Sequence, residues 1–249
     1  MTTAERLTAV MDELAGMASE ENRAGMARYG IKTDDAFGVS VYELRRIARA
    51  YRRDHELALA LWGTGNHEAR VLASMVDDPA QVTQEQMESW AGDFDSWDVC
   101  DQVTSNLFDK TPFAYDKVAE WSGREGEWVK RAAFATAAAL AVQDKKAADE
   151  RFVPILALIR REAGDDRNFV KKAVNWALRN VGKRNAALNA EAVACAERIL
   201  AAAGDGREPE ARSARWIARD ALRELNSDKR RAGLGLPPLT PAPDGDVTP

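Results

Sequence analysis

The stretch "EWVKRAAFATAAAL", residues 127–140, shows the character of the fold most clearly. Alanine and leucine are strong helix formers, so the stretch predicts a helix, and its small side chains allow neighbouring helices to approach closely. Trp128 stands at the start of this helix, with Lys130 and Arg131 in its first turns. Such a pair of charges usually belongs to a solvated helix face.

The rest of the chain has a similar pattern. Ala, Leu, Arg and Glu dominate, and apolar residues recur at spacings of three and four, which predicts helices nearly throughout. The predicted helices span residues 3–18, 20–29, 40–52, 54–63, 66–76, 83–92, 96–109, 112–122, 126–142, 145–162, 167–181, 187–203 and 208–226. Short connectors join them in pairs. We therefore expect an all-α solenoid of HEAT-like helical repeats, with a period of about 40 residues and a concave groove.

Composition indicates the domain organisation and the compartment. The helical pattern predicts one repeat domain over residues 1–232, followed by a flexible Pro/Gly-rich tail over residues 233–249. Cys100 and Cys195 lack the spacing of a zinc site and fit a reducing compartment. The sequence shows neither a signal peptide nor a run of about 18 apolar residues, so we expect a cytoplasmic protein without a membrane span.

Charge gives a mixed indication. The net charge of -5 and the pI near 5.3 disfavour a nucleic-acid binder, because phosphate contact favours a basic surface. The charge is unevenly distributed, however. Every charged residue in residues 167–184 is basic: Arg167, Lys171, Lys172, Arg179, Lys183 and Arg184.

Several common kinds of active site are excluded by inventory. The sequence holds two histidines, His55 and His67, and has no G-x-S-x-G, Gly-rich phosphate loop or H-E-x-x-H motif. The sequence therefore does not contain the motifs needed for a catalytic triad, a P-loop or a zinc-activated water. What stands out instead is a set of seven tryptophans, several of them beside charged residues.

The segment "SWDVCDQV", residues 96–103, places an indole and a carboxylate one helical turn apart. Trp97 and Asp101 share a face with Thr104 and Phe108, next to an apolar stripe of Cys100, Val103 and Leu107. The structural alternative is a half-buried core tryptophan, with Asp101 tied to a neighbouring helix.

The segment "FVKKAVNWALRN", residues 169–180, combines an aromatic side chain with a basic face. Phe169, Ala173, Trp176 and Asn180 fall on one side of the helix, with Lys172 and Arg179 on a neighbouring side. Basic side chains next to an aromatic suit contact with phosphates and bases, although a core tryptophan is the structural alternative. Later in the chain Arg212, Arg215 and Arg219 continue the basic pattern at spacings of three and four.

The ordered motifs resemble a known family. They are "MARYGI", "FGVSVYELRRIAR", "WDVCD", "WVKRAAF" and "FVKKAVNWALR", and they resemble those of the AlkD-type DNA alkylation repair proteins, HEAT-like-repeat DNA glycosylases of bacteria, over about residues 20–225. The resemblance implies that Asp101 is catalytic, that Trp97 and Trp176 face the lesion, and that Arg131, or alternatively Lys130, contacts phosphate. It implies excision of cationic N3- and N7-alkylated purines from double-stranded DNA held in a concave groove, without flipping of the base.

The chemistry of glycosidic-bond cleavage agrees with the catalytic role that the resemblance implies for Asp101. A cationic purine is a good leaving group, so cleavage of its glycosidic bond mainly requires a carboxylate that stabilises the positive charge developing on the sugar and positions water. Indole faces also attract a cationic nucleotide. We expect a monomer without metal or cofactor, whose DNA-binding residues are Arg131, Lys130, Lys171, Lys172, Arg179, Lys183, Arg184, Arg212 and Arg215.

A rival function from another class stays open. The chain could be a non-catalytic HEAT-repeat scaffold that binds DNA or a protein partner. The set of Trp97, Asp101 and Trp176 favours the enzyme, and the negative net charge favours the scaffold.

Overall fold

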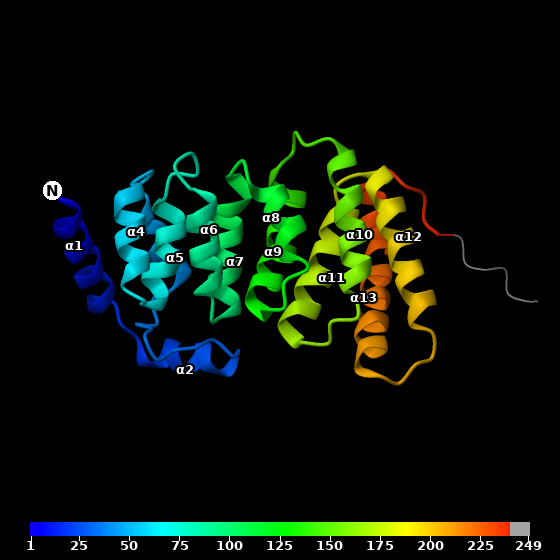
Figure 1. Cartoon of the computed structure of the whole chain (residues 1–249), viewed down its shortest axis with the longest axis horizontal. Coiled ribbons are helices and arrows are strands. Elements are labelled where there is room, and N and C mark those ends of the chain that lie inside the picture. The colour runs from blue at the N-terminus through cyan, green and yellow to red at the C-terminus, as the bar shows by residue number, and fades with distance from the viewer. Residues whose placement is uncertain (240–249) are drawn as a thin grey trace, which may run out of the picture. The chain divides into compact units, whose positions relative to one another are not determined.

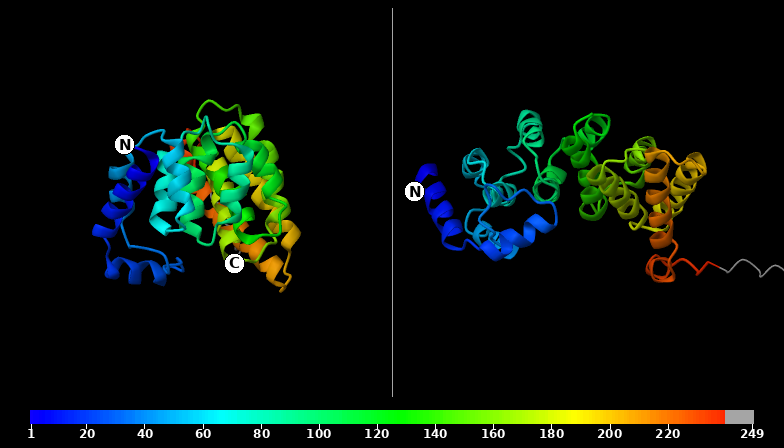
Figure 2. Two further views of the ribbon diagram at one scale, coloured as in Figure 1. Left: turned by 60° about the vertical axis from the view of Figure 1, so that its left-hand side comes forward. Right: turned by 90° about the horizontal axis from the view of Figure 1, so that it is seen from below.

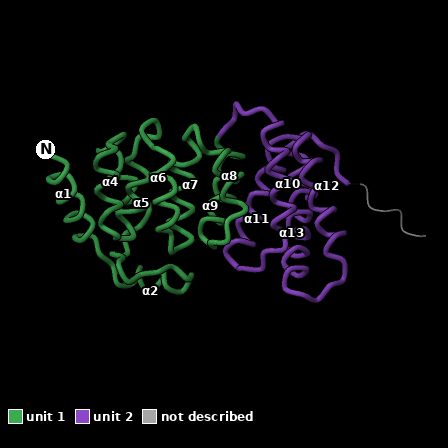
Figure 3. The backbone as a smooth tube through the Cα atoms, in the orientation of Figure 1, with its two compact units in different colours: residues 1–143 green, residues 144–249 purple. Residues whose placement is uncertain are grey.

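The computed structural model describes residues 1–239, and every regular element in that range is helical (Figure 1). The chain forms two compact units, residues 1–143 and 144–249 (Figure 3). The prediction of an all-α fold is confirmed. The single repeat domain expected over residues 1–232 stays a prediction.

The first unit is a series of helix pairs. Its elements are α1 (Thr3–Gly16), α2 (Glu20–Arg28), α3 (Val41–Ala48), α4 (His55–Gly63), α5 (His67–Val76), α6 (Gln84–Gly92), α7 (Trp97–Asn106), the 3-10 turn η1 (Phe108–Lys110), α8 (Ala114–Trp121) and α9 (Glu127–Gln143). Within pairs α4 packs on α5 and α8 packs on α9. Along one row α3 contacts α5, α5 contacts α7 and α7 contacts α9, and Figure 2 shows α5 and α7 on one side of α4 and α6.

The second unit continues the pattern with longer helices. It contains η2 (Asp149–Arg151), α10 (Val153–Glu162), α11 (Asn168–Gly182), α12 (Ala186–Ala203), α13 (Pro209–Leu225) and α14 (Asp228–Gly233). Helices α11, α12 and α13 all contact one another. Their buried faces consist mainly of Ala, Val, Leu and Ile.

Some helices differ from the prediction. The helix expected over 145–162 is a 3-10 turn followed by α10, because Pro154 is accommodated only in the first turn of a helix. The helix expected over 40–52 ends at Ala48. A short helix that the prediction missed, α14, is capped by Ser227 and ends where the predicted tail begins. Residues 240–249 of that tail lie outside the described residues.

Tryptophans build much of the core of the first unit. Trp62 and Trp90 stack with their ring centroids 4.0 Å apart, and Phe94, Phe108 and Trp121 extend this aromatic cluster. Such contacts stabilise the core beyond the burial of their area. The sequence left the roles of Trp62, Trp90 and Trp121 open, and the structure assigns all three to the core.

Helix α9 is buried nearly all round. Its residues from Arg131 to Ala141 are all buried, and most of them are alanines. Small side chains let α7 and α8 lie close to its axis, as the stretch 127–140 predicted. The expectation that Arg131 lies on a solvated face is wrong, because the close approach of α7 covers it.

No helix among residues 1–239 is both long enough and apolar enough to cross a membrane.

Close packing in the second unit gives a test of this fold. A Cβ atom on Gly182 of α11 would lie 2.8 Å from both terminal methyl carbons of Leu225 and 2.9 Å from Cβ of Ala192. Gly182→Ala should therefore destabilise the protein by about 1–3 kcal/mol through overpacking, measured as a lower urea midpoint. Gly164→Ala is the matched control, because the nearest atom to its added Cβ lies at an ordinary 3.6 Å. Equal midpoints for the two variants would contradict the packing.

Candidate functional site

Trp97 is the first residue of α7 and is half-buried. Its indole Nε1 donates a hydrogen bond of 3.0 Å to the carbonyl oxygen of Tyr29, the C-terminal cap of α2. In Figure 1, α2 runs crosswise to the neighbouring helices and ends beside α7. The Tyr29 side chain itself is 76% exposed. Trp97 is therefore an edge residue and is absent from the aromatic cluster of the core.

A buried carboxylate holds the segment between α2 and α3 in place. Glu68, on α5, is completely buried and accepts hydrogen bonds from the backbone N–H groups of Phe37, Gly38 and Val39. Burial alone would raise the pKa of Glu68, but His67 and the Phe37 amide outweigh it and hold that pKa below its ordinary value. An ionised carboxylate thus fixes this segment.

His67 connects that carboxylate to α7. Its Nε2 lies 2.7 Å from Oδ2 of Asp98, and its Nδ1 lies 3.7 Å from Oε1 of Glu68. Burial alone would lower the pKa of His67, but Asp98 and Glu68 outweigh it and raise that pKa to about 9. Next to Trp97, therefore, a charged imidazolium joins α5 to the start of α7 at neutral pH.

Asp101 and Arg131 form a two-point ion pair between α7 and α9. Arg131 Nε donates to Asp101 Oδ1 at 3.0 Å, and Nη2 donates to Oδ2 at 2.7 Å. The Arg131 side chain is 6% exposed and the Asp101 side chain 18% exposed. Bidentate pairs of this kind are strong and directional. The structure thus brings together two of the predicted site residues, with Arg131 against the carboxylate.

The ion pair controls the charge of Asp101. Burial raises the pKa of this carboxyl above its ordinary value, while the guanidinium of Arg131 pulls the pKa down. The hydroxyls of Thr104 and Ser105 both donate to the Asp101 carbonyl oxygen and fix the backbone there. Asp101 consequently depends on Arg131 to stay ionised.

The apolar stripe predicted on α7 is confirmed, with one correction. Cys100, Val103 and Leu107 are fully buried, as expected. Phe108 does not share the Asp101 face, because α7 ends at Asn106 and Phe108 lies in η1, where it is fully buried. The free thiols are not poised for reaction, since burial raises the pKa of Cys100 well above its ordinary value and that of Cys195 to about 11.

In the second unit, Trp176 is half-buried on α11, one position after the buried Asn175. Four of the predicted DNA-binding residues nearby have protein partners. Arg179 and Lys183 pair with Glu224; Arg184 donates to the Ala147 carbonyl and lies over the Phe152 ring; Arg215 donates to the carbonyls of Ala203 and Gly204 at the end of α12. Lys130, in the first unit, is half-buried on α9.

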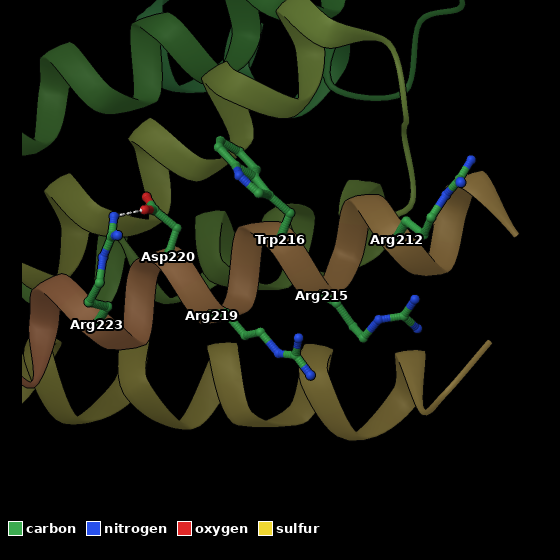
Figure 4. Close-up of a pocket in the computed structure, with 6 residues that line it drawn as sticks. All are labelled: Arg212, Arg215, Trp216, Arg219, Asp220 and Arg223. Atoms are coloured by element: carbon green, nitrogen blue, oxygen red, sulfur yellow. Dashed lines mark hydrogen bonds and ion pairs between the residues drawn. The ribbon is translucent and has the colours of Figure 1, made fainter. Parts of the chain in front are cut away.

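The remaining predicted cations of the second unit are more available. Lys172 and Arg212 are exposed, and Lys171 lies 5.3 Å from the centroid of the Trp216 ring. Arg212 belongs to a hollow of about 390 Å³ on α13, lined by Arg212, Arg215, Trp216, Arg219, Asp220 and Arg223. Figure 4 shows the Trp216 ring on one side of α13 and the Arg215 and Arg219 side chains on the other, with Arg223 paired to Asp220. We call this surface the α13 hollow.

Sequence reasoning missed several residues of these sites. Trp216, at 42% exposed, was left open, and its i+3 and i+7 neighbours Arg219 and Arg223 were a visible signal of a basic helix face. The His67, Glu68 and Asp98 cluster had no such signal. Its members lie on two helices, and only the packing of α5 on α7 brings them together.

Comparison with known proteins identifies the family. The model of the DNA alkylation repair enzyme family matches residues 10–225, and the chain belongs to that family. Among solved structures, the chain is similar to a protein of "a new family of proteins related to the HEAT-like repeat DNA glycosylases with affinity for branched DNA structures". Sequence identity is 20%, coverage is 94% of this chain and 98% of that chain, and the TM-score is 0.74. None of the curated proteins matches the chain's sequence.

These findings confirm the predicted resemblance and the HEAT-like repeat fold. The concave groove expected with that fold stays a prediction.

The imidazolium of His67 predicts a specific pH dependence of stability. Asp98 and Glu68 raise the pKa of His67 above its ordinary value. The interaction of the charged imidazolium with these two carboxylates therefore contributes stability that is complete below pH 6.5 and is lost as the pH rises through about 9. The shift corresponds to about 3 kcal/mol, by order of magnitude. Urea unfolding at both ends of this range should show a larger loss in wild type than in His67→Gln. Identical losses would contradict the charged pair.

Proposed function

We propose that the protein is a DNA glycosylase that hydrolyses the N-glycosidic bond of cationic N3- and N7-alkylated purines in duplex DNA. The observation that carries this proposal is the arrangement at Asp101. A carboxylate paired with a guanidinium lies one helical turn after an edge tryptophan, in a chain of the DNA alkylation repair enzyme family.

The chemistry asked of this site is modest. An alkylated purine leaves as a neutral base, so the electrons of the breaking C1′–N bond go to the purine and positive charge develops on the deoxyribose. An ionised Asp101 stabilises that charge and accepts a proton from the attacking water. Trp97 contributes the attraction of its ring face for a cationic nucleotide. Trp176 is proposed as a second lesion-facing indole.

Arg131 supports the reaction in this proposal by keeping Asp101 ionised. Two of the carboxylate's acceptor positions are taken by the guanidinium, and the others remain for water or the sugar. The contact of Arg131 with phosphate, which the family resemblance implies, would have to come from the same buried guanidinium and stays a prediction.

A second candidate function is binding of branched DNA without catalysis. The observation that favours it is the similar solved structure, whose family is described as having affinity for branched DNA structures. A protein of that kind would use the exposed cations and would not need Asp101. Base release therefore separates the two candidates.

The catalytic proposal predicts base release from duplexes containing N7-methylguanine and N3-methyladenine, above spontaneous depurination. Asp101→Asn should lower the single-turnover rate by at least about 100-fold, since it removes the charge aimed at the transition state. This substitution also removes the charged acceptor of two hydrogen bonds from the buried Arg131 guanidinium, so we expect weaker folding as well.

A double variant separates chemistry from folding. Replacing both partners of a buried pair costs less stability than breaking the pair, so Asp101→Asn with Arg131→Gln should fold better than Asp101→Asn alone. It should still release no base. Wild-type rates in a folded Asp101→Asn protein would refute the mechanism, and DNA binding without base release by wild type would favour the branched-DNA candidate.

The α13 hollow predicts a specific loss of DNA affinity. Arg212 and Arg219 are exposed, and neither guanidinium group has a hydrogen-bonding or ionic partner within residues 1–239. Replacing both with Gln should lower the slope of log affinity against log salt by about 1–2, since each phosphate contact contributes about 0.9. Arg198→Gln on α12 is the control for loss of charge. An unchanged slope in the double variant, measured by fluorescence anisotropy, would exclude this surface.

A further inference from the structure

A second basic surface lies in the first unit, and none of its residues is among the predicted DNA contacts. A hollow of about 300 Å³ is lined by Arg45, Ala48, Arg49, Arg52, Met75, Asn106 and Lys110. Four of these seven residues are cationic, and none is acidic. We call this surface the α3 hollow. Its lining comes from α3 and the turn after it, from α5, from α7 and from η1.

The three arginines of the α3 hollow are exposed, and their guanidinium groups have no hydrogen-bonding or ionic partner within residues 1–239. Their neighbour Arg46 behaves differently, because it pairs with Glu43 and Glu13. Of the four arginines in residues 45–52, one is therefore paired with two carboxylates, and the other three face a hollow. Like charges four residues apart, as in Arg45 and Arg49, slightly destabilise a helix.

Helix dipoles explain only part of this cluster. Cations in the last turn of α3 are favourable there without any ligand, which accounts for Arg45. Lys110 likewise caps the carbonyls of Ser105 and Asn106 at the end of α7. Arg52 lies beyond α3 and caps no helix. The dipoles therefore leave unexplained why cations from separate elements surround a single hollow.

The α3 hollow shares helix α7 with the proposed catalytic carboxylate. Asn106 follows Asp101 by five residues on the same helix, a rise of about 7.5 Å along the α7 axis. The helix that carries the proposed catalytic carboxylate thus also supplies part of the lining of the hollow.

We infer that the α3 hollow is a binding site for the phosphodiester backbone of duplex DNA, formed by Arg45, Arg49 and Arg52. The inference rests on the proposed DNA-binding function and adds to it a contact on the first unit, next to the catalytic helix. Guanidinium groups match phosphate oxygens in shape and charge. A lining that is mostly cationic is unsuited to a small apolar ligand, whose pockets are mostly apolar.

The first test measures duplex binding over a series of salt concentrations. The triple variant Arg45→Gln, Arg49→Gln and Arg52→Gln should lower the salt slope by about 2–3 relative to wild type. Arg46→Gln is the matched control: it removes one charge from the same helix but outside the hollow, and should leave the slope unchanged. Because the replaced side chains are exposed, the urea midpoint should hardly move.

The second test locates the contact on the DNA. Neutral methylphosphonate linkages are placed one at a time through a duplex with a central N7-methylguanine. In wild type, affinity should fall at least about threefold at a few adjacent positions near the lesion, and in the triple variant the same linkages should have no effect. That non-additivity is the signature of a direct contact.

The outcomes separate this inference from the proposed function. Wild-type binding with the same salt slope and the same interference pattern in the triple variant overturns the α3 hollow and leaves the proposed function standing. Absence of both DNA binding and base release in wild type overturns the proposed function, and the inference with it. A reduced slope together with lost interference supports the inference.

Discussion

The close packing of α7 against α9 is the constraint on which the rest of the first unit depends. Alanines on α9 bring the two helix axes close enough for Arg131 to reach Asp101 with two hydrogen bonds. A bulkier face would hold the helices apart and leave both charges to water. Because the pair is largely buried, its charges act through a medium of low polarity, where each strongly affects the other's ionisation. The close packing of α7 on α9 thus also sets the electrostatic interaction between Asp101 and Arg131.

A second set of buried charges organises the edge of the same helix. Glu68 binds the backbone of the segment before α3, His67 joins Glu68 to Asp98, and Trp97 holds the end of α2. Buried backbone amides in a connecting segment need hydrogen-bond acceptors. The Glu68 carboxylate accepts from three of them and so takes the place of the carbonyl oxygens that would accept these hydrogen bonds in a regular helix. The start of α7 is therefore fixed from two sides, with Trp97 at its exposed corner.

The chain has a negative net charge although it belongs to the DNA alkylation repair enzyme family, and its cations are unevenly distributed between paired and exposed positions. Many basic residues are occupied within the protein: Arg179 and Lys183 by Glu224, Arg184 and Arg215 by backbone carbonyls. Exposed arginines remain around the α13 hollow and the α3 hollow. The net charge of the chain says little about a local surface, since phosphate is attracted by the cations that are free to meet it.

The sequence by itself determined the helical class, because helix propensity and three-to-four periodicity are local properties that each segment carries alone. It also singled out Trp97, Asp101 and Arg131 through ordered motifs. Only the tertiary structure decided which charges are paired. Whether Arg131 meets Asp101 or solvent, and whether Trp62 is core and Trp216 surface, depends on which helix covers each residue. The helix that covers each residue is distant from it in the chain, so local sequence patterns do not predict which helix that is.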